Sequence, residues 1–220
     1  MITGIFFDAG GIFYKRHEST RHYALRLVTE QGLSDEISAE QDARMRTLKE
    51  QASNGWIDAS TYWDEFLLAH AVADQAKRAE LIDKILKHVN KVSDVPGARE
   101  VVKVLKQRGF ILGVITSTMY SIEWKMSWLA AVGVAEFIDV LTCSTELGQG
   151  KSHPTIYWAA LNKAKLNPWQ TAYVANGARE LTEAHHLGMS TVAVLYEPDA
   201  KADYYVQTLP DLLNLPIFQR

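Results

Sequence analysis

The sequence of 220 residues has little of several features that would indicate particular classes of protein. It has one cysteine, Cys143, which excludes an internal disulfide and is typical of a reducing compartment. It has no apolar run of membrane-spanning length, and its N-terminus lacks the basic leader of a signal peptide. A net charge of −3 without a long basic run argues against nucleic acid or an anionic membrane as the partner. We therefore expect a cytoplasmic protein, monomeric or homodimeric, that acts on a small molecule.

The composition is otherwise that of an ordinary globular chain, with 47% hydrophobic and 22% charged residues. The length suits one large domain, or one domain with a smaller one inserted into it. Strand signals are almost absent between Glu18 and Asn90, and the apolar spacing there is typical of helices. The pattern predicts four consecutive helices with capping residues at their starts: Ser19, Ser38, Asp58 or Ser60, and Asp74.

The rest of the chain alternates between short apolar runs and amphipathic segments. The apolar runs predict strands near 4–7, 110–115, 137–141, 171–175 and 191–195, the last clear strand. Helices are expected between them, at about 98–107, 121–132, 154–164 and 179–187. Such alternation predicts an α/β fold in three layers around a parallel sheet. We expect residues 1–15 and 93–220 to form this core and residues 16–92 to form a small all-helical domain.

Polar residues stand where the predicted strands end. Asp8 follows the first strand and precedes Gly10, and the second strand ends in Thr116 and Ser117. Asn176 follows a later strand, and Lys151 lies in a glycine-rich loop. The carboxyl ends of parallel strands share one edge of the sheet, so these groups can converge. A carboxylate nucleophile needs a nearby cation, and hydroxyls or amides that hold the transferred group.

Four short segments carry these residues. They read Phe-Phe-Asp-Ala-Gly-Gly at 6–11, Leu-Gly-Val-Ile-Thr-Ser at 112–117, Gly-Lys-Ser-His-Pro-Thr-Ile-Tyr at 150–157, and Tyr-Val-Ala-Asn-Gly-Ala-Arg-Glu-Leu at 173–181. In this order they resemble the motifs of the haloacid dehalogenase (HAD) superfamily of hydrolases. The resemblance implies a Rossmann-like core with a helical cap domain inserted after the first strand.

The resemblance also implies residue roles. Asp8 would attack the substrate and form a covalent aspartyl intermediate that water hydrolyses. Lys151 would offset negative charge on Asp8 and the substrate, and Thr116 would bind the transferred group. Four further residues would bind substrate: Ser117, Gly10, Asn176 and Tyr157. On the breadth of the family, the first expectation is hydrolysis of a phosphate ester of a small soluble metabolite.

Three positions depart from the pattern of the family's phosphatases. Gly10 stands where those enzymes carry a second aspartate as general acid/base, which contributes about 10²–10⁴-fold to a rate. Asn176 replaces the usual aspartate of the fourth motif, and Ser152 replaces the proline after the lysine. A Mg²⁺ ion is still an expected cofactor, with Asp8, the Gly10 carbonyl and Glu180 as its ligands, since Mg²⁺ accepts one or two carboxylates plus waters.

Other readings remain open. The 2-haloacid dehalogenases of the superfamily need no metal, lack the second aspartate, and carry an Asn in the fourth motif and a Tyr six residues after the lysine, as Asn176 and Tyr157 do here. Unlike them, this chain has small Gly10 in place of a bulky aromatic and Ile12 in place of a threonine.

The cap residue that would contact the substrate is also open. Arg44 and Arg46 are candidates for the arginine that a dehalogenase takes from its cap. The phosphonate hydrolases of the superfamily take a lysine from the cap, for which Lys49 is a candidate. The absence of acids at Gly10 and Asn176 also allows a third class, a catalytically weak or inactive protein that binds a ligand or partner.

Overall fold

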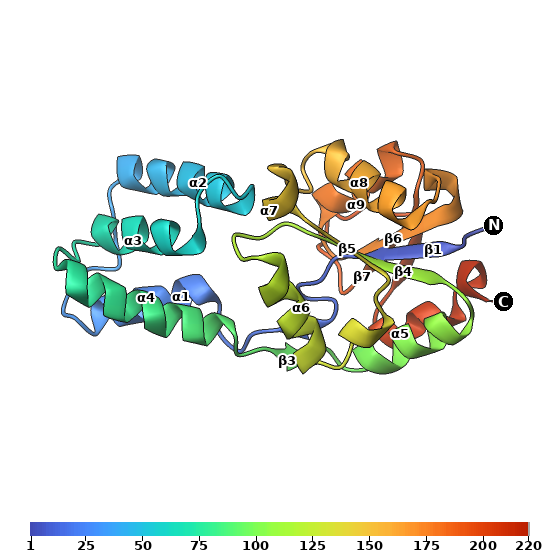
Figure 1. Cartoon of the computed structure of the whole chain (residues 1–220), viewed down its shortest axis with the longest axis horizontal. Coiled ribbons are helices and arrows are strands. Elements are labelled where there is room, and N and C mark those ends of the chain that lie inside the picture. Colours follow the sequence, from blue (N-terminus) through green and yellow to red (C-terminus); the bar gives the residue numbers. More distant parts are fainter. Residues whose placement is uncertain (220) are drawn as a thin grey trace.

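The computed structural model describes residues 1–219, and it shows a central sheet with helices on both faces and a group of four helices beyond one end (Figure 1). The six strands of the sheet all run parallel. In their order across the sheet they are β5 (Val140–Cys143), β4 (Ile111–Thr116), β1 (Gly4–Phe7), β6 (Thr171–Ala175), β7 (Ser190–Val194) and β8 (Tyr204–Val206). The predicted α/β fold with a parallel sheet is therefore confirmed.

Helices cover the sheet on both faces. They are α5 (Ala98–Gln107), α6 (Ile122–Ala131), α7 (Ser144–Leu147), α8 (Pro154–Ala164) and α9 (Ala178–His186), with short 3₁₀ turns η1 (Ala135–Phe137), η2 (Pro168–Gln170), η3 (Leu209–Asn214) and η4 (Pro216–Phe218). Alternate residues of a strand serve opposite faces: Ile5 and Phe7 pack in the cluster that contains α5 and α6, whereas Phe6 packs in the cluster that contains α8 and α9. The core therefore has the three predicted layers.

The inserted segment is all helical, as predicted. It contains α1 (Thr20–Thr29), α2 (Ala39–Ser53), α3 (Ala59–Ala69) and α4 (Gln75–Val89). Each helix begins after a residue whose side chain accepts a hydrogen bond from the first turn, and these residues are Ser19, Ser38, Asp58 and Asp74. None of the helices in residues 1–219 has the length and apolar character needed to cross a membrane.

The chain enters and leaves the helical segment through a two-stranded antiparallel pair, β2 (Tyr14–Lys15) with β3 (Ser93–Asp94). These short strands lie beside the boundaries expected at 15/16 and 92/93. Buried residues from the helices and from the sheet form one continuous hydrophobic cluster. We infer that the division into a core (1–15 and 93–220) and a cap (16–92) follows the strand pair, although the two parts pack against each other.

Two details of the sheet differ from the sequence prediction. The segment expected as a strand at 137–141 begins as the turn η1, and strand β5 starts only at Val140. Asp139 explains the delay, because its carboxylate accepts the Leu112 amide and pairs with Lys106. The strand expected to be the last is followed by β8, whose edge position is fixed by Asp203 accepting the amide and hydroxyl of Thr191.

Candidate active site

Asp8 lies at the carboxyl end of β1, in the middle of the sheet. Its amide donates to the Val174 carbonyl at 3.0 Å and so extends the ladder with β6 by one residue. The chain then turns sharply, since Gly11 adopts a φ of 80° and its amide donates to the Tyr14 carbonyl at 2.8 Å. This turn leaves the Asp8 side chain 12% exposed at the edge where the strands end.

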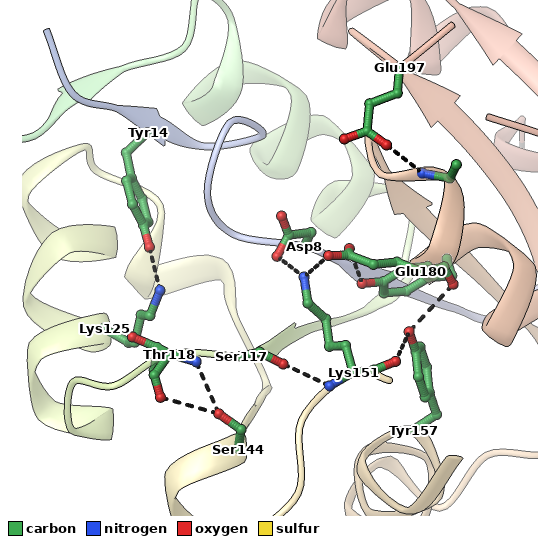
Figure 2. A network of polar contacts seen from close by, with 12 residues as sticks. Asp8, Tyr14, Ser117, Thr118, Lys125, Ser144, Lys151, Tyr157, Glu180 and Glu197 are labelled. Atoms are coloured by element: carbon green, nitrogen blue, oxygen red, sulfur yellow. Dashed lines mark hydrogen bonds and ion pairs between the residues drawn. The ribbon is translucent and has the colours of Figure 1, made fainter. Parts of the chain in front are cut away.

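Lys151 reaches Asp8 from the loop between α7 and α8. Its amide donates to Ser117 Oγ at 2.7 Å, which ties this loop to the end of β4. Gly150 permits the close approach, because a Cβ there would lie 2.9 Å from Ser117 Oγ. The Lys151 ammonium then lies 2.5 Å from Asp8 Oδ1 and 2.5 Å from Glu180 Oε1 (Figure 2). Three elements distant in sequence thus meet at one buried ammonium.

The charges of this cluster are strongly coupled. Burial would lower the pKa of Lys151, but the Asp8 and Glu180 carboxylates outweigh burial and raise it, so the ammonium stays charged. Burial raises the pKa of Glu180, and the Asp8 charge adds to this effect while Lys151 opposes it. Two carboxylates share one ammonium, so the three side chains carry a net charge of −1 when all are ionised.

Hydrogen bonds fix the end of β4, near Asp8. Thr116, its last residue, is buried. Beyond Ser117, the Thr118 amide donates to Ser144 Oγ at 3.0 Å, and the Ser144 hydroxyl donates back to the Thr118 carbonyl at 3.3 Å (Figure 2). Thr116 thus lies at the end of β4 and Ser117 lies in the loop that follows it, where Ser117 accepts the Lys151 amide.

Gly10 and Asn176 differ in their surroundings at the turn after Asp8. The Asn176 side chain covers Gly11, because a Cβ at Gly11 would lie 2.7 Å from Asn176 Nδ2. Gly10 is exposed, and a Cβ at Gly10 would meet no atom within 4 Å. The position where phosphatases of the superfamily carry an acid is therefore open space in this chain.

Two buried tyrosines donate hydrogen bonds to Lys151 and Glu180. The Tyr157 hydroxyl donates to the Lys151 carbonyl at 3.2 Å, and the Tyr173 hydroxyl donates to Glu180 Oε2 at 3.1 Å. Their rings pack edge to face with centroids 5.4 Å apart. Tyr157 has no exposed surface in this arrangement, so here it orients the lysine loop, and its predicted contact with substrate stays a prediction.

The residues proposed as magnesium ligands do not form a metal site by themselves in this arrangement. Asp8 and Glu180 each direct an oxygen at the Lys151 ammonium, and the neighbouring donor of the fourth motif is the amide Asn176. Within residues 1–219 no group of three or more His, Cys, Asp or Glu side chains is placed to hold a metal ion. The donors are oxygens of the kind that Mg²⁺ accepts, but the Lys151 ammonium occupies one oxygen of each carboxylate and would compete with the ion.

The three candidate cap residues, Arg44, Arg46 and Lys49, differ in whether they line a cavity. Arg46 and Lys49 of α2 line a cavity of about 350 Å³ whose walls include Tyr62, Trp63 and, from the loop after β4, Tyr120. Arg44 lies outside this cavity and pairs with Glu65 at 2.7 Å. Met119 and Tyr120, which line the cavity, belong to the same loop as Ser117, which accepts the Lys151 amide. Arg46 and Lys49 are therefore the cap candidates connected to the Asp8 cluster through this loop.

Sequence reasoning missed two residues near Asp8, Tyr14 and Lys125. The Lys125 ammonium donates to the Tyr14 hydroxyl at 2.9 Å, and both side chains are buried (Figure 2). A signal was present, because Lys125 stands one helical turn before the buried pair Trp128 and Leu129 and so lies on the apolar face of its helix.

Comparison with known proteins places this geometry in a family. A family model described as "Haloacid dehalogenase-like hydrolase" matches residues 5–194. The chain therefore belongs to the haloacid dehalogenase-like hydrolases, as its motifs predict. Phosphatases of this family typically use Mg²⁺.

Individual relatives fall into both chemical classes. A "Glyceraldehyde 3-phosphate phosphatase" from Pyrococcus furiosus is 25% identical over 96% of this chain and 91% of its own length. Among solved structures, a "2-Haloacid Dehalogenase" from Pseudomonas syringae superposes with a TM-score of 0.70 at 21% identity over 97% of each chain. The "putative HAD-hydrolase YfnB" from Bacillus subtilis, "bound to magnesium", gives a TM-score of 0.70 at 16% identity over 97% of each chain. These two structures show the shared fold.

Proposed function

We propose that this protein is a hydrolase that forms a covalent ester on Asp8 with a small anionic substrate, and that phosphate monoesters are the first substrate class. The observation that carries the proposal is the 2.5 Å contact between the Lys151 ammonium and Asp8 Oδ1 at the carboxyl edge of the sheet. A cation in this position offsets the charge of the carboxylate and of an approaching anion. The phosphatase relative, 91% of whose length is covered by the match, supports the substrate class.

The chain's residues suggest a sequence of steps. Asp8 Oδ2, which accepts no hydrogen bond from the described residues, attacks phosphorus while the bond from phosphorus to the ester oxygen breaks. The leaving alcohol takes its proton from solvent, because Gly10 has none to give. In this proposal the Thr116 and Ser117 hydroxyls and the amides of their loop hold the phosphoryl oxygens. Water then attacks phosphorus, releases phosphate and restores the Asp8 carboxylate.

Magnesium dependence stays a prediction for this chain. Mg²⁺ would supply positive charge to the transferred phosphoryl group when bound. The steps above use only groups of the protein and water, since Lys151 occupies one oxygen of each carboxylate beside Asp8.

One set of observations favours a second candidate, metal-independent dehalogenation of a 2-haloacid. A lysine ammonium contacts both carboxylates, and the fourth motif carries Asn176. Arg46 and Lys49 of the cap line the neighbouring cavity, where they can bind a substrate carboxylate. In this reaction Asp8 would displace the halide from carbon, and water would then attack the Asp8 carbonyl carbon of the ester.

The test compares the wild type with Asp8→Asn on two panels. Phosphate monoesters are tested with Mg²⁺ and with EDTA, and chloride release from 2-chloropropionate is measured with EDTA. Asp35→Asn is the matched control, because Asp35 is exposed and lies in the helical segment. Phosphate release that requires Asp8 supports the proposal, whereas chloride release that requires Asp8 supports the second candidate. A wild type with neither activity, and with a thermal shift on binding a ligand, would favour the inactive binding protein.

A further inference from the structure

Lys125 is a buried lysine without a carboxylate partner. It is 7% exposed, and its ammonium donates one hydrogen bond, to the Tyr14 hydroxyl. No carboxylate in the described part of the chain forms an ion pair with it, whereas the equally buried Lys151 has two. Lysines are rarely buried unless they are paired, because the charged form loses its hydration. No directly paired carboxylate in the described residues therefore accounts for the burial of this charge.

A second cation, Arg16, lies against the same aromatic group. The Arg16 guanidinium carbon is 4.6 Å from the centre of the Trp128 ring, and Lys125 Nζ is 5.0 Å from the same ring. Arg16 Nε donates to the Val89 carbonyl, but Nη2 is buried and has no partner among residues 1–219. Two positive charges thus lie over one aromatic ring, which stabilises them only in part.

The Asp8 carboxylate acts on the Lys125 ammonium. Burial lowers the pKa of Lys125 to about 8, and the first influence that opposes burial is the Asp8 charge. The other charged or titratable groups that act on Lys125 are Lys151, Arg16 and Cys143. In the view of Figure 2, Tyr14 and Lys125 lie on one side of Asp8 and Glu180 lies on the other.

A second cation offsets the negative charge of the site. Asp8, Glu180 and Lys151 together carry a net charge of −1 when all three are ionised, and an anionic substrate would add to it. At an effective dielectric of about 20, two unit charges about 8 Å apart still interact by about 2 kcal/mol, so an uncompensated site would repel the substrate. Lys125 brings the four groups to neutrality, and Arg16 adds a further positive charge.

We propose that Lys125, supported by Arg16, is a positioning residue whose buried charge balances the Asp8 and Glu180 carboxylates and so allows the site to hold an anionic substrate. The inference rests on the proposed role of the Asp8 cluster as the active site. It differs from a purely structural role, in which Lys125 would only hold Tyr14 and, through Tyr14, the β2–β3 connection to the helical segment.

Sulfate binding tests this inference without requiring turnover. Sulfate keeps a charge of −2 throughout the pH range used, and its affinity is measured by thermal-shift titration at constant ionic strength. At pH 6.5 Lys125→Met is expected to bind sulfate about tenfold more weakly than the wild type. The matched control Lys103→Met removes an exposed lysine from α5 and is expected to stay within twofold. Tyr14→Phe keeps the charge and removes the hydrogen bond, so its affinity should stay within threefold.

The pH profile provides a second measurement, and its first part needs only the wild type. Wild-type sulfate affinity is expected to fall as the pH rises through about 8, the pKa of Lys125, and this fall should be absent in Lys125→Met. A flat wild-type profile, equal losses in Lys125→Met and Tyr14→Phe, or no sulfate binding at all would overturn the inference. Sulfate binding that depends on Lys125, in a protein without Asp8-dependent turnover, would support the inference and refute the proposed function. Turnover that depends on Asp8 with an unchanged KM in Lys125→Met would do the reverse.

Discussion

Ion pairs in the helical segment and at the carboxyl edge of the sheet use the same side chains in opposite surroundings. In α4 the side chains of Lys87 and Asp83 are 73% and 60% exposed, whereas those of Lys151 and Asp8 are 9% and 12% exposed. An exposed pair contributes about 0–1 kcal/mol to stability, whereas removing one partner of a buried pair costs about 3–5 kcal/mol. Excess negative charge in a buried cluster lowers stability, so under the proposed function these charges are kept for binding and chemistry.

The largest effect is expected from removing the cation that Asp8 and Glu180 share, which is the Lys151 ammonium. Lys151→Met leaves the Asp8 and Glu180 carboxylates buried and facing each other. We expect it to lower the free energy of unfolding by about 3–5 kcal/mol at pH 7, and to lower any Asp8-dependent turnover by about 10²–10³-fold. Chemical denaturation and steady-state kinetics measure these effects. The control Lys87→Met should change stability by less than about 1 kcal/mol. Similar losses in the two variants would remove the distinction between the two regions.

The next prediction adds carboxylates to the same site. Gly10 has open space for a side chain, so Gly10→Asp together with Asn176→Asp is expected to fold. The added charge should destabilise the protein without a metal and create a site that Mg²⁺ can occupy. We expect Mg²⁺ to raise the Tm of the double variant more than that of the wild type, and Mg²⁺-dependent phosphate release to rise about 10²-fold. A folded double variant with no gain in either measurement would contradict the prediction.

The pH dependence of stability in Glu180→Gln tests whether burial raises the pKa of Glu180. Burial, with Asp8, raises the pKa of Glu180, so the folded protein holds this proton to higher pH than the unfolded chain does. The stabilisation from the protonated form is complete below about pH 4.5 and is lost as the pH rises through the raised pKa. Glu180→Gln should therefore be no more stable than the wild type at low pH and increasingly more stable as the pH rises.

Denaturant unfolding at several pH values measures the Glu180 effect. The control Glu146→Gln removes one partner of an exposed pair with Lys163. It should show no such pH dependence. A stability difference between Glu180→Gln and the wild type that does not change with pH would show that burial does not control this carboxyl group.

The sequence predicted the layout of the fold because its signals are local. Alternating apolar runs, helix caps such as Ser38 and glycines after strands each depend on a few neighbouring residues, and the structure confirms the helices and the parallel sheet. The strand β8 escaped notice because it is three residues long and owes its place to Asp203, which binds Thr191 on the neighbouring strand. That contact has no signature within either segment.

The site was predictable only in part, for the same reason. The meeting of Asp8 with Lys151 follows from the rule that parallel strands end at one edge. The contact of Lys151 with Glu180 depends on the length and rotamers of both side chains, which a spacing pattern does not specify. Lys125 reads as an ordinary helical lysine until Trp128 and Tyr14 are seen to bury it.

The smallest expected effect asks whether an exposed charge can matter for function while contributing little to stability. Arg46 and Arg44 lie on the same helix, both are largely exposed, and each forms a carboxylate pair, but only Arg46 lines the cavity beside the 116–120 loop. We expect Arg46→Gln and Arg44→Gln to change the free energy of unfolding by less than about 1 kcal/mol each. Arg46→Gln should raise the KM for an anionic substrate several-fold with little change in kcat, because an exposed charge at the cavity contributes to binding rather than to the chemical step. Arg44→Gln should leave KM within twofold. Equal effects on KM would mean that the cavity does not receive the substrate, and that the functional charges of this protein are confined to its buried cluster.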